Sequence, residues 1–594
     1  MDWNLRGVAL VFLIALVAAS AGSPVCPRPS AGDSILGRPD SCWDLDPTAV
    51  LRGYQIGVVE GDEAVLQKAL SIVHKNREEY VALLFYASWC VGPSSVKSMS
   101  LDKFVDPPND TEPKEDMQEN CPPHAAILSF PAAGQVNPML DLAKLLHSQG
   151  FCITFINTEF AHHRGLENGG RHALLASESF RFEAIPDGYS SSASDSFDVK
   201  ELESSLRETG AAPIEELLQK LRCSTDAPPI TCVISNFLMT FAVDAERLGV
   251  PHLVFWTTSA CSLLGSLQLQ ELIQRGYTPL KDHKCITNGY LDTTIDWIPG
   301  MREMRLRDLS SFIRTTDLDD HFLKNEMEGV DCALKASGLI LNTFDHMESQ
   351  VLDVLKSFFP RIYTVGPLLK LLNQIKGDPK NSLQLSLWEE DHGWKEWLNT
   401  QKDASVIYVS FGSLTTLTSE QLTEFAWGLA DSNHPFMWII RPNLLKGSSY
   451  AALPEKFMEE TEGRSFFAGW CHQSEVLSHP SIGGFLTHGG WNSMLESLCG
   501  GVPIICWPGF ADQYTNCRYA CKEWEIGTEI GQQVKREHIK DLVVELLEGE
   551  RGQQLRKNVM KWKKLAEQAT AQGGSSYTNL ERLVKDMNET MEKN

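Results

Sequence analysis

The residues best able to do chemistry gather between positions 470 and 513. An apolar run over 482–487 has the length and the glycine content of a buried parallel strand. It ends in a His-Gly-Gly turn at 488–490, and residues 491–499 then have the pattern of a helix that a glycine pair closes. A strand, a glycine turn and a helix start in this order predict an anion-binding site.

The physical basis of that site is the start of the predicted helix. Its first N–H groups are free, its end carries partial positive charge, and glycine lets the backbone approach a ligand closely. His488, Asn492 and Ser493 lie where their side chains can add donors to a diphosphate. Taken singly, each of these residues is ordinary in a doubly wound domain. Their joint spacing carries the prediction.

The elements that must position this turn follow a regular order from Pro122 onward. The apolar runs predict strands separated by helical lengths, including a helix over 138–148. Such alternation is typical of βαβ units and parallel sheets, and some 470 residues exceed one sheet, so an α/β fold with two Rossmann-like domains is expected. A polar stretch at 366–385 is the expected hinge. The predicted strands are 125–130, 151–157, 230–235, 253–256, 338–342, 406–411 and 482–487.

Composition excludes several classes of function. A net charge of −24 would repel nucleic acid. The chain has no Walker loop, no HExxH and no paired CxxC with zinc-like spacing, so no metal site is expected. No segment after the N-terminus reaches the length of a membrane span.

Residues 470–513 closely resemble the nucleotide-sugar signature box of plant family 1 UDP-sugar-dependent glycosyltransferases. The box opens on Trp470 and closes on Asp512-Gln513, with His472 where Pro is common and Gly489 where Cys is common. The resemblance extends over about four-fifths of the chain and implies the two-domain GT-B fold. Three loop-like stretches resemble the cyanohydrin-glucosyltransferase subgroup, namely 289–292, 296–300 and 311–314.

The resemblance also implies which residues contact a UDP-sugar. An ionised carboxylate such as Glu496 is a strong acceptor for two adjacent hydroxyls. Gln513, rather than a His, favours glucose over galactose. The implied contacts are Trp470 and the Cys471 backbone for uracil; Gln473 and Glu496 for ribose; Ser413, His488, Gly490, Asn492 and Ser493 for the diphosphate; and Thr257, Trp491, Asp512 and Gln513 for the sugar.

The catalytic dyad of the family is replaced in this chain. In the family, a His in the first strand-to-helix loop takes the proton of the acceptor, and an Asp about a hundred residues later orients that His. These positions hold Gln135 and Asn236 here, and a neutral amide cannot accept a proton near pH 7. Loss of a general base costs about 10²–10⁴-fold in rate. His162 and His163 are interpreted as a solvated helix start rather than as substitutes.

The expected function is therefore inverting O-glucosyl transfer from UDP-glucose, a co-substrate, to a small lipophilic acceptor. No cofactor and a monomer are expected. The enzyme is expected to transfer glucose to alcohols at a strongly reduced rate, or to be limited to acidic acceptors such as phenols, carboxylates or thiols. A non-catalytic UDP-sugar-binding protein is the first alternative, and a thioredoxin-like redox protein is the second.

The N-terminal region differs from the rest. Residues 1–23 have the pattern of a secretory leader. Residues 24–95 resemble a truncated, thioredoxin-like part of the adenylylsulfate-reductase-like proteins, with Cys90 but Pro93 at the second Cys position. The leader indicates the secretory route, whereas scattered single cysteines indicate a reducing compartment, so these indications conflict. The predicted domains are the leader 1–23, the truncated segment 24–95, a linker 96–121, an acceptor domain 122–370, a UDP-sugar domain 386–560 and C-terminal helices 561–594.

Overall fold

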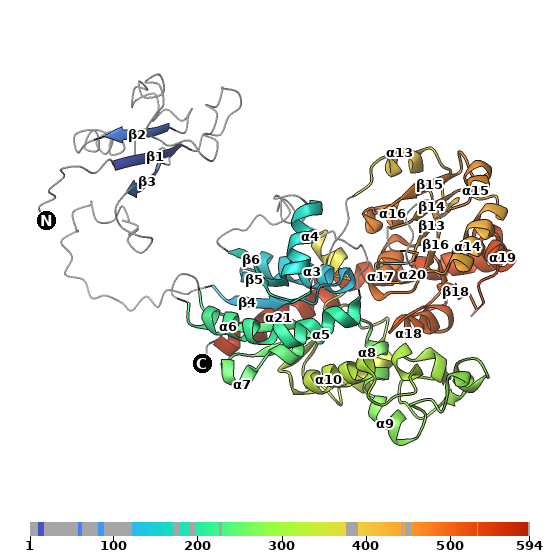
Figure 1. The fold of residues 1–594 in the computed structure, drawn as a ribbon, viewed down its shortest axis with the longest axis horizontal. Helices are drawn as coiled ribbons and strands as arrows, with labels where there is room; N and C mark the ends of the chain where they lie inside the picture. Colours follow the sequence, from blue (N-terminus) through green and yellow to red (C-terminus); the bar gives the residue numbers. More distant parts are fainter. Residues whose placement is uncertain are drawn as a thin grey trace, which may run out of the picture. The chain divides into compact units, whose positions relative to one another are not determined.

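The structure, a computed structural model, divides into two compact units, residues 1–118 and 119–594 (Figure 1). Each unit is described by itself. In the first unit the structure describes three short strands only. In the second it describes residues 122–169, 179–189, 198–224, 228–375, 390–441, 444–445, 453–531 and 533–591.

The three strands of the first unit form an antiparallel sheet in the order β2-β1-β3. They are β1 (Leu10–Leu16), β2 (Gly57–Gly61) and β3 (Val81–Ala87). The strand β3 precedes Cys90, but Cys90, Pro93 and the predicted linker lie outside the described residues, as does the predicted leader apart from β1. These strands give the thioredoxin-like prediction no support.

The second unit begins with a seven-stranded parallel sheet in the order β12-β11-β8-β7-β4-β5-β6. Every residue of β4, β7 and β8 is buried, because helices cover both faces of a parallel sheet. We call this part the first-sheet domain. Its strands are β4 (His124–Leu128), β5 (Cys152–Thr158), β6 (Phe180–Ile185), β7 (Cys232–Asn236), β8 (His252–Trp256), β11 (Gly338–Leu341) and β12 (Ile362–Thr364).

One helix of this domain departs from its predicted bounds. The sequence predicted a helix beginning at Pro138, whereas α3 spans Ala133–Ser148 and holds Pro138 inside it. The prediction was wrong at this end because proline favours the first helical turn but does not exclude later positions. The other helices are α4 (Glu159–Gly169), α5 (Val199–Thr209), α6 (Ala211–Arg222), α7 (Ala245–Leu248), α8 (Ala260–Ser266), α9 (Leu269–Gln274), α10 (His321–Lys335), α11 (Ser349–Leu355) and α12 (Leu368–Leu372).

A six-stranded parallel sheet in the order β15-β14-β13-β16-β17-β18 forms the second-sheet domain. Two parallel sheets with covering helices confirm the predicted α/β architecture of two Rossmann-like domains. The boundaries predicted at 370 and 386 stay predictions, since residues 376–389 are not described. The strands are β13 (Val406–Ser410), β14 (Phe436–Ile439), β15 (Ser465–Ala468), β16 (Ile482–Thr487), β17 (Ile504–Cys506) and β18 (Gly527–Glu529). The helices are α13 (Trp394–Asn399), α14 (Ser419–Asp431), α15 (Glu455–Glu460), α16 (Gln473–Ser478), α17 (Trp491–Gly500), α18 (Gln513–Arg518) and α19 (Arg536–Glu548).

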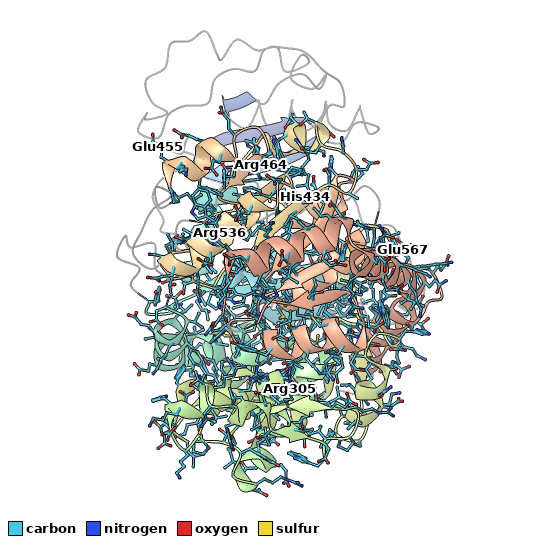
Figure 2. All side chains as sticks on the ribbon, turned by 90° about the vertical axis from the view of Figure 1, so that its right-hand side faces the viewer. Arg305, His434, Glu455, Arg464, Arg536 and Glu567 are labelled. Carbon is cyan, nitrogen blue, oxygen red and sulfur yellow. The ribbon has the colours of Figure 1, made fainter. Side chains whose placement is uncertain are left out.

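The last two helices connect the domains, and the first of them begins at Glu550, before the predicted boundary at 561. The helix α20 (Glu550–Thr570) packs on α17 and α12, and α21 (Ser575–Met591) packs on β12. Figure 1 labels α17, α20 and α21. Leu583 of α21 is buried in the core of the first-sheet domain, and the Tyr363 hydroxyl donates to Asp586 Oδ2 at 2.6 Å. Glu567 of α20, labelled in Figure 2, pairs with Lys370 of α12 at 3.1 Å.

No disulfide joins the eleven cysteines from Cys152 onward, all of which the structure describes, and seven of them are buried. The prediction of scattered single cysteines in this part of the chain is confirmed. Among the helices that the structure describes, none is both long and apolar enough to cross a bilayer.

Candidate active site

A cavity of about 290 Å³ lies between the two sheet domains. It is lined by α3 and the loop before it, by the start of α17, and by the ends of β13 and β16. All thirteen residues that the sequence predicted as UDP-sugar contacts line this cavity, and so does Gln135. Asn236 does not line it and is fully buried behind Gln135.

One end of the cavity is the predicted strand–turn–helix. The chain leaves β16, turns at Gly489 with φ +82°, and enters α17 with Gly490 as its N-cap. No side chain caps this helix, so the N–H groups of its first turn face the cavity unpaired. A Cβ at Gly490 would lie 2.5 Å from Nε2 of His488, which explains the glycine there.

His488 contributes polarity to this end of the cavity rather than charge. Burial, and then the nearby Arg441 guanidinium, lower the pKa of His488 to about 4. Its imidazole is therefore neutral at pH 7, and it can donate or accept one hydrogen bond at each nitrogen. Positive potential for a diphosphate comes from the helix end.

Glu496 and Gln473 form the other end of the cavity. Gln473 Nε2 donates to Glu496 Oε2 at 2.5 Å and to Ser493 Oγ at 2.8 Å, and its Oε1 accepts from the Tyr408 hydroxyl at 3.3 Å. These bonds fix the orientation of the Gln473 amide. Burial, and to a smaller extent the charge of Asp141, raise the pKa of Glu496 to about 7, although the hydrogen bond from Gln473 opposes the rise.

Sequence reasoning missed two residues of this end, Tyr408 and Asp141. Both line the cavity. Tyr408 gave no signal within the apolar strand β13, since an aromatic residue is expected there. Asp141 gave a signal, because it interrupts the apolar run 138–143 in the middle of α3.

Asp512, Gln513 and Trp491 line the cavity where the resemblance implies the sugar. Gln513 Oε1 accepts from the backbone N–H groups of Gly509 and Phe510, each at 3.0 Å, which leaves its amide nitrogen for a ligand. Burial raises the pKa of Asp512 to about 6, while Asn516 Nδ2 donates to its carboxylate at 2.7 Å.

Trp491 connects the two domains. It is 3% exposed, and its indole Nε1 donates to the carbonyl oxygen of Asn342 at 2.9 Å. The ring is therefore held in place by the first-sheet domain. Only a small part of its surface is left to contact a sugar.

Gln135 occupies the position where the family carries its catalytic His, and a bond network fixes its amide. Asn236 Oδ1 accepts from the backbone N–H of Leu238 at 3.0 Å, so Asn236 Nδ2 must point the other way. Asn236 Nδ2 donates to Gln135 Oε1 at 2.9 Å and to Thr257 Oγ1 at 3.0 Å, and the Thr257 hydroxyl also donates to Gln135 Oε1. Because Leu238 N–H is only a donor, the chain of bonds leaves Gln135 Nε2 as the group presented to the cavity.

The paired histidines His162 and His163 lie away from Gln135 and the cavity. His162 and His163 are the fourth and fifth residues of α4, where His163 is exposed and His162 is half-buried, and neither lines this cavity. Burial and the neighbouring His163 lower the pKa of His162. Among the described residues, no group of three or more His, Cys, Asp or Glu could hold a metal ion.

A second cavity of about 1040 Å³ adjoins the first, and the two share five lining residues, among them Ser413 and Phe510. Aromatic rings give it an apolar wall, and its ionisable lining side chains are five basic and three acidic. The rings are Phe160, Phe322, Trp507, Phe510 and Tyr514. The ionisable residues are Arg164, Lys200, Arg307, Arg314 and Arg441, with Asp198, Asp308 and Glu529.

Comparison with known proteins identifies the family. The family described as "UDP-glucoronosyl and UDP-glucosyl transferase" matches residues 333–570. The (R)-mandelonitrile beta-glucosyltransferase of Prunus dulcis is 51% identical over 466 residues, covering 78% of this chain and 96% of that protein. The 7-deoxyloganetin glucosyltransferase of Catharanthus roseus is 48% identical over 468 residues, again covering 78% of this chain and 96% of the relative.

A solved structure agrees with the family match and with the two relatives. The crystal structure of Os79 from O. sativa in complex with UDP has a TM-score of 0.64 and 25% sequence identity, covering 78% of this chain and all of the other. UDP-sugar glycosyltransferases need no cofactor, in line with the sequence prediction. The sheets, the cavity between them and these relatives lead to one conclusion: the chain belongs to the plant family 1 UDP-glycosyltransferases, which are enzymes of GT-B fold.

Proposed function

We propose that the protein transfers glucose from UDP-glucose, with inversion, to a small acceptor that reaches the site already ionised. The observation that carries the proposal is the network around Gln135. Its Oε1 is occupied by Asn236 and Thr257, so a hydrogen-bond donor stands where the family places a proton acceptor.

The donor half of the proposal rests on the 290 Å³ cavity. Its helix end suits a diphosphate, and Glu496 with Gln473 suits the ribose hydroxyls. Relatives named as glucosyltransferases, and Gln513 at its position in the box, favour glucose as the sugar. UDP is the ligand of the solved relative Os79.

The acceptor half of the proposal rests on which group can take the proton of the acceptor. In inverting transfer the acceptor oxygen forms a bond to the anomeric carbon, the bond from that carbon to UDP breaks, and a neutral hydroxyl must also lose its proton. Gln135 Nε2 cannot take that proton, but its N–H can stabilise an oxygen that is already negative. Phenolates, carboxylates and thiolates require no base.

The charge of the larger cavity supports the same acceptor class. Its lining carries five basic and three acidic side chains in a chain whose net charge is −24. Its aromatic wall suits a lipophilic body. The two relatives are named for different acceptors, mandelonitrile and 7-deoxyloganetin, so they do not select one.

Calorimetry and an acceptor series test the proposal. We expect saturable UDP binding, and, at mildly alkaline pH where all three acids are ionised, transfer to benzoate, 4-nitrophenol and thiophenol that is faster than transfer to benzyl alcohol by about 10²-fold or more. Equal or faster transfer to benzyl alcohol would contradict the proposal.

A second candidate, a non-catalytic UDP-sugar-binding protein, is favoured by the loss of both ionisable dyad groups. UDP binding without transfer to any of the four acceptors would establish it.

A further inference from the structure

The smaller cavity has an unusual charge for a site that holds an anion. Three carboxylates line it, Asp141, Glu496 and Asp512, and among the described residues no Lys or Arg is part of the lining. A sugar nucleotide carries its negative charge on the diphosphate. The carboxylates must therefore face the parts of the ligand that offer hydrogen-bond donors.

Asp141 and Glu496 meet at the end of the cavity away from the phosphate cradle. Asp141 lies on α3 and Glu496 on α17, and these two helices are in contact (Figure 1). Glu496 is five residues beyond Trp491, so it lies about 7.5 Å along the helix axis from the N-terminal turn. That separation suits the ribose of a nucleotide whose diphosphate sits at the turn.

Each of these carboxylates has one oxygen engaged by the protein. Asp141 Oδ1 lies 3.3 Å from Lys144 Nζ, and the Lys144 side chain is 2% exposed. Glu496 Oε2 accepts from Gln473 Nε2 at 2.5 Å. Within the described residues, no hydrogen bond from the protein reaches Asp141 Oδ2 or Glu496 Oε1.

We propose that Asp141 is a donor-binding residue: its carboxylate accepts a hydrogen bond from one ribose hydroxyl while Glu496 accepts one from the other. The inference rests on the proposed function, since it takes a uridine nucleotide as the ligand. Each sheet domain then holds one hydroxyl of the same diol.

Electrostatics support this assignment. Burial raises the pKa of Asp141, with Lys144 opposing the rise, and the Asp141 charge in turn raises the pKa of Glu496. Two carboxylates that face each other without a donor between them repel. Two hydroxyl donors placed between them relieve that repulsion.

The test compares UDP with its 2′-deoxy and 3′-deoxy analogues by calorimetry. One of the two analogues lacks the hydroxyl that donates a hydrogen bond to Asp141. The wild-type protein should bind this analogue roughly tenfold to a hundredfold more weakly than it binds UDP. In Asp141→Asn the ratio of the affinity for UDP to the affinity for that analogue should shrink, because an amide is a weaker acceptor than a carboxylate. The ratio for the other analogue should not change. Asp141→Glu is expected to restore part of it.

Asp353→Asn is the matched control. Asp353 pairs with Lys356 at the same spacing of three residues, but both side chains are exposed. It should leave all three affinities unchanged. Weaker binding of UDP and both analogues by the same factor in Asp141→Asn, or unchanged or tighter binding of UDP, would overturn the inference. If the wild-type protein does not bind UDP at all, the proposed function itself fails.

Discussion

Asn492 supplies the hydrogen bond that Pro138 cannot make. Pro138 lies inside α3 and has no N–H, so the carbonyl of Gly134, four residues earlier, loses its helical partner. Asn492 Nδ2 donates to that carbonyl at 2.8 Å from the start of α17. The bond ties the segment that carries Gln135 to the anion-binding turn of the other domain.

Asn492→Ala should lower the free energy of unfolding by about 1–2 kcal/mol, because it leaves the Gly134 carbonyl without a protein partner. Denaturant unfolding measures this change. Asn558→Ala is the control, since Asn558 Nδ2 donates to the Glu525 carbonyl at 3.0 Å on the surface. In a Pro138→Ala background a backbone N–H is restored to the helix, so Asn492→Ala should cost less there. An equal cost in both backgrounds would refute the relationship.

Glu496→Gln should change the pH dependence of stability. The folded-state pKa of Glu496 is raised from 4.5 to about 7, so its ionisation as the pH rises destabilises the wild-type fold. The variant has no such group. The unfolding free energy of Glu496→Gln should therefore equal that of the wild-type protein below pH 4.5. From there to pH 7 the variant should become progressively more stable than the wild-type protein, and the difference should level off at roughly 1–3 kcal/mol. Thermal unfolding across this range checks the prediction, and a difference that does not vary with pH would contradict it.

Glu496→Gln should also bind UDP about tenfold more weakly than the wild-type protein, or worse, because an amide is a weaker acceptor for the ribose hydroxyls.

Gly489→Ala should be destabilising for two separable reasons. Gly489 has φ +82°, and a Cβ there would lie 2.7 Å from Cys506 Sγ. Gly573→Ala is a matched control, because Gly573 has φ +77° with nothing within 4 Å of its Cβ, and so isolates the backbone strain of about 1–2 kcal/mol. Gly489→Ala should cost more than this control. Adding Cys506→Ala should make the cost of Gly489→Ala similar to that of the control. If Gly489→Ala costs no more than Gly573→Ala in the wild-type background, the contact with Cys506 does not explain the glycine.

The sequence predicted the donor side well because its information is local. Strand β16 has the predicted bounds, and α17 extends one residue past them. The strand, turn and helix occur within one short segment, so spacing along the chain translates directly into geometry. The start of α3 was wrong because the contact that tolerates Pro138 inside a helix comes from Asn492, far away in the sequence.

Other features depend on contacts between the domains and had no sequence pattern. The amide orientation of Gln135 is set through Asn236 by Leu238, more than a hundred residues away. Asp141 becomes a cavity residue only because α3 meets α17. The larger cavity is assembled from loops and helix starts of both domains, so its volume and charge could not be read in advance.

Transfer of glucose to benzyl alcohol by Gln135→His combined with Asn236→Asp tests the central claim most directly. The pair supplies a base and the carboxylate that orients it, so the transfer rate should rise by about 10²–10⁴-fold while the affinity for UDP stays within a factor of about two. A double variant that still binds UDP-glucose but transfers no faster than the wild-type protein would contradict the claim that the missing proton acceptor limits this enzyme.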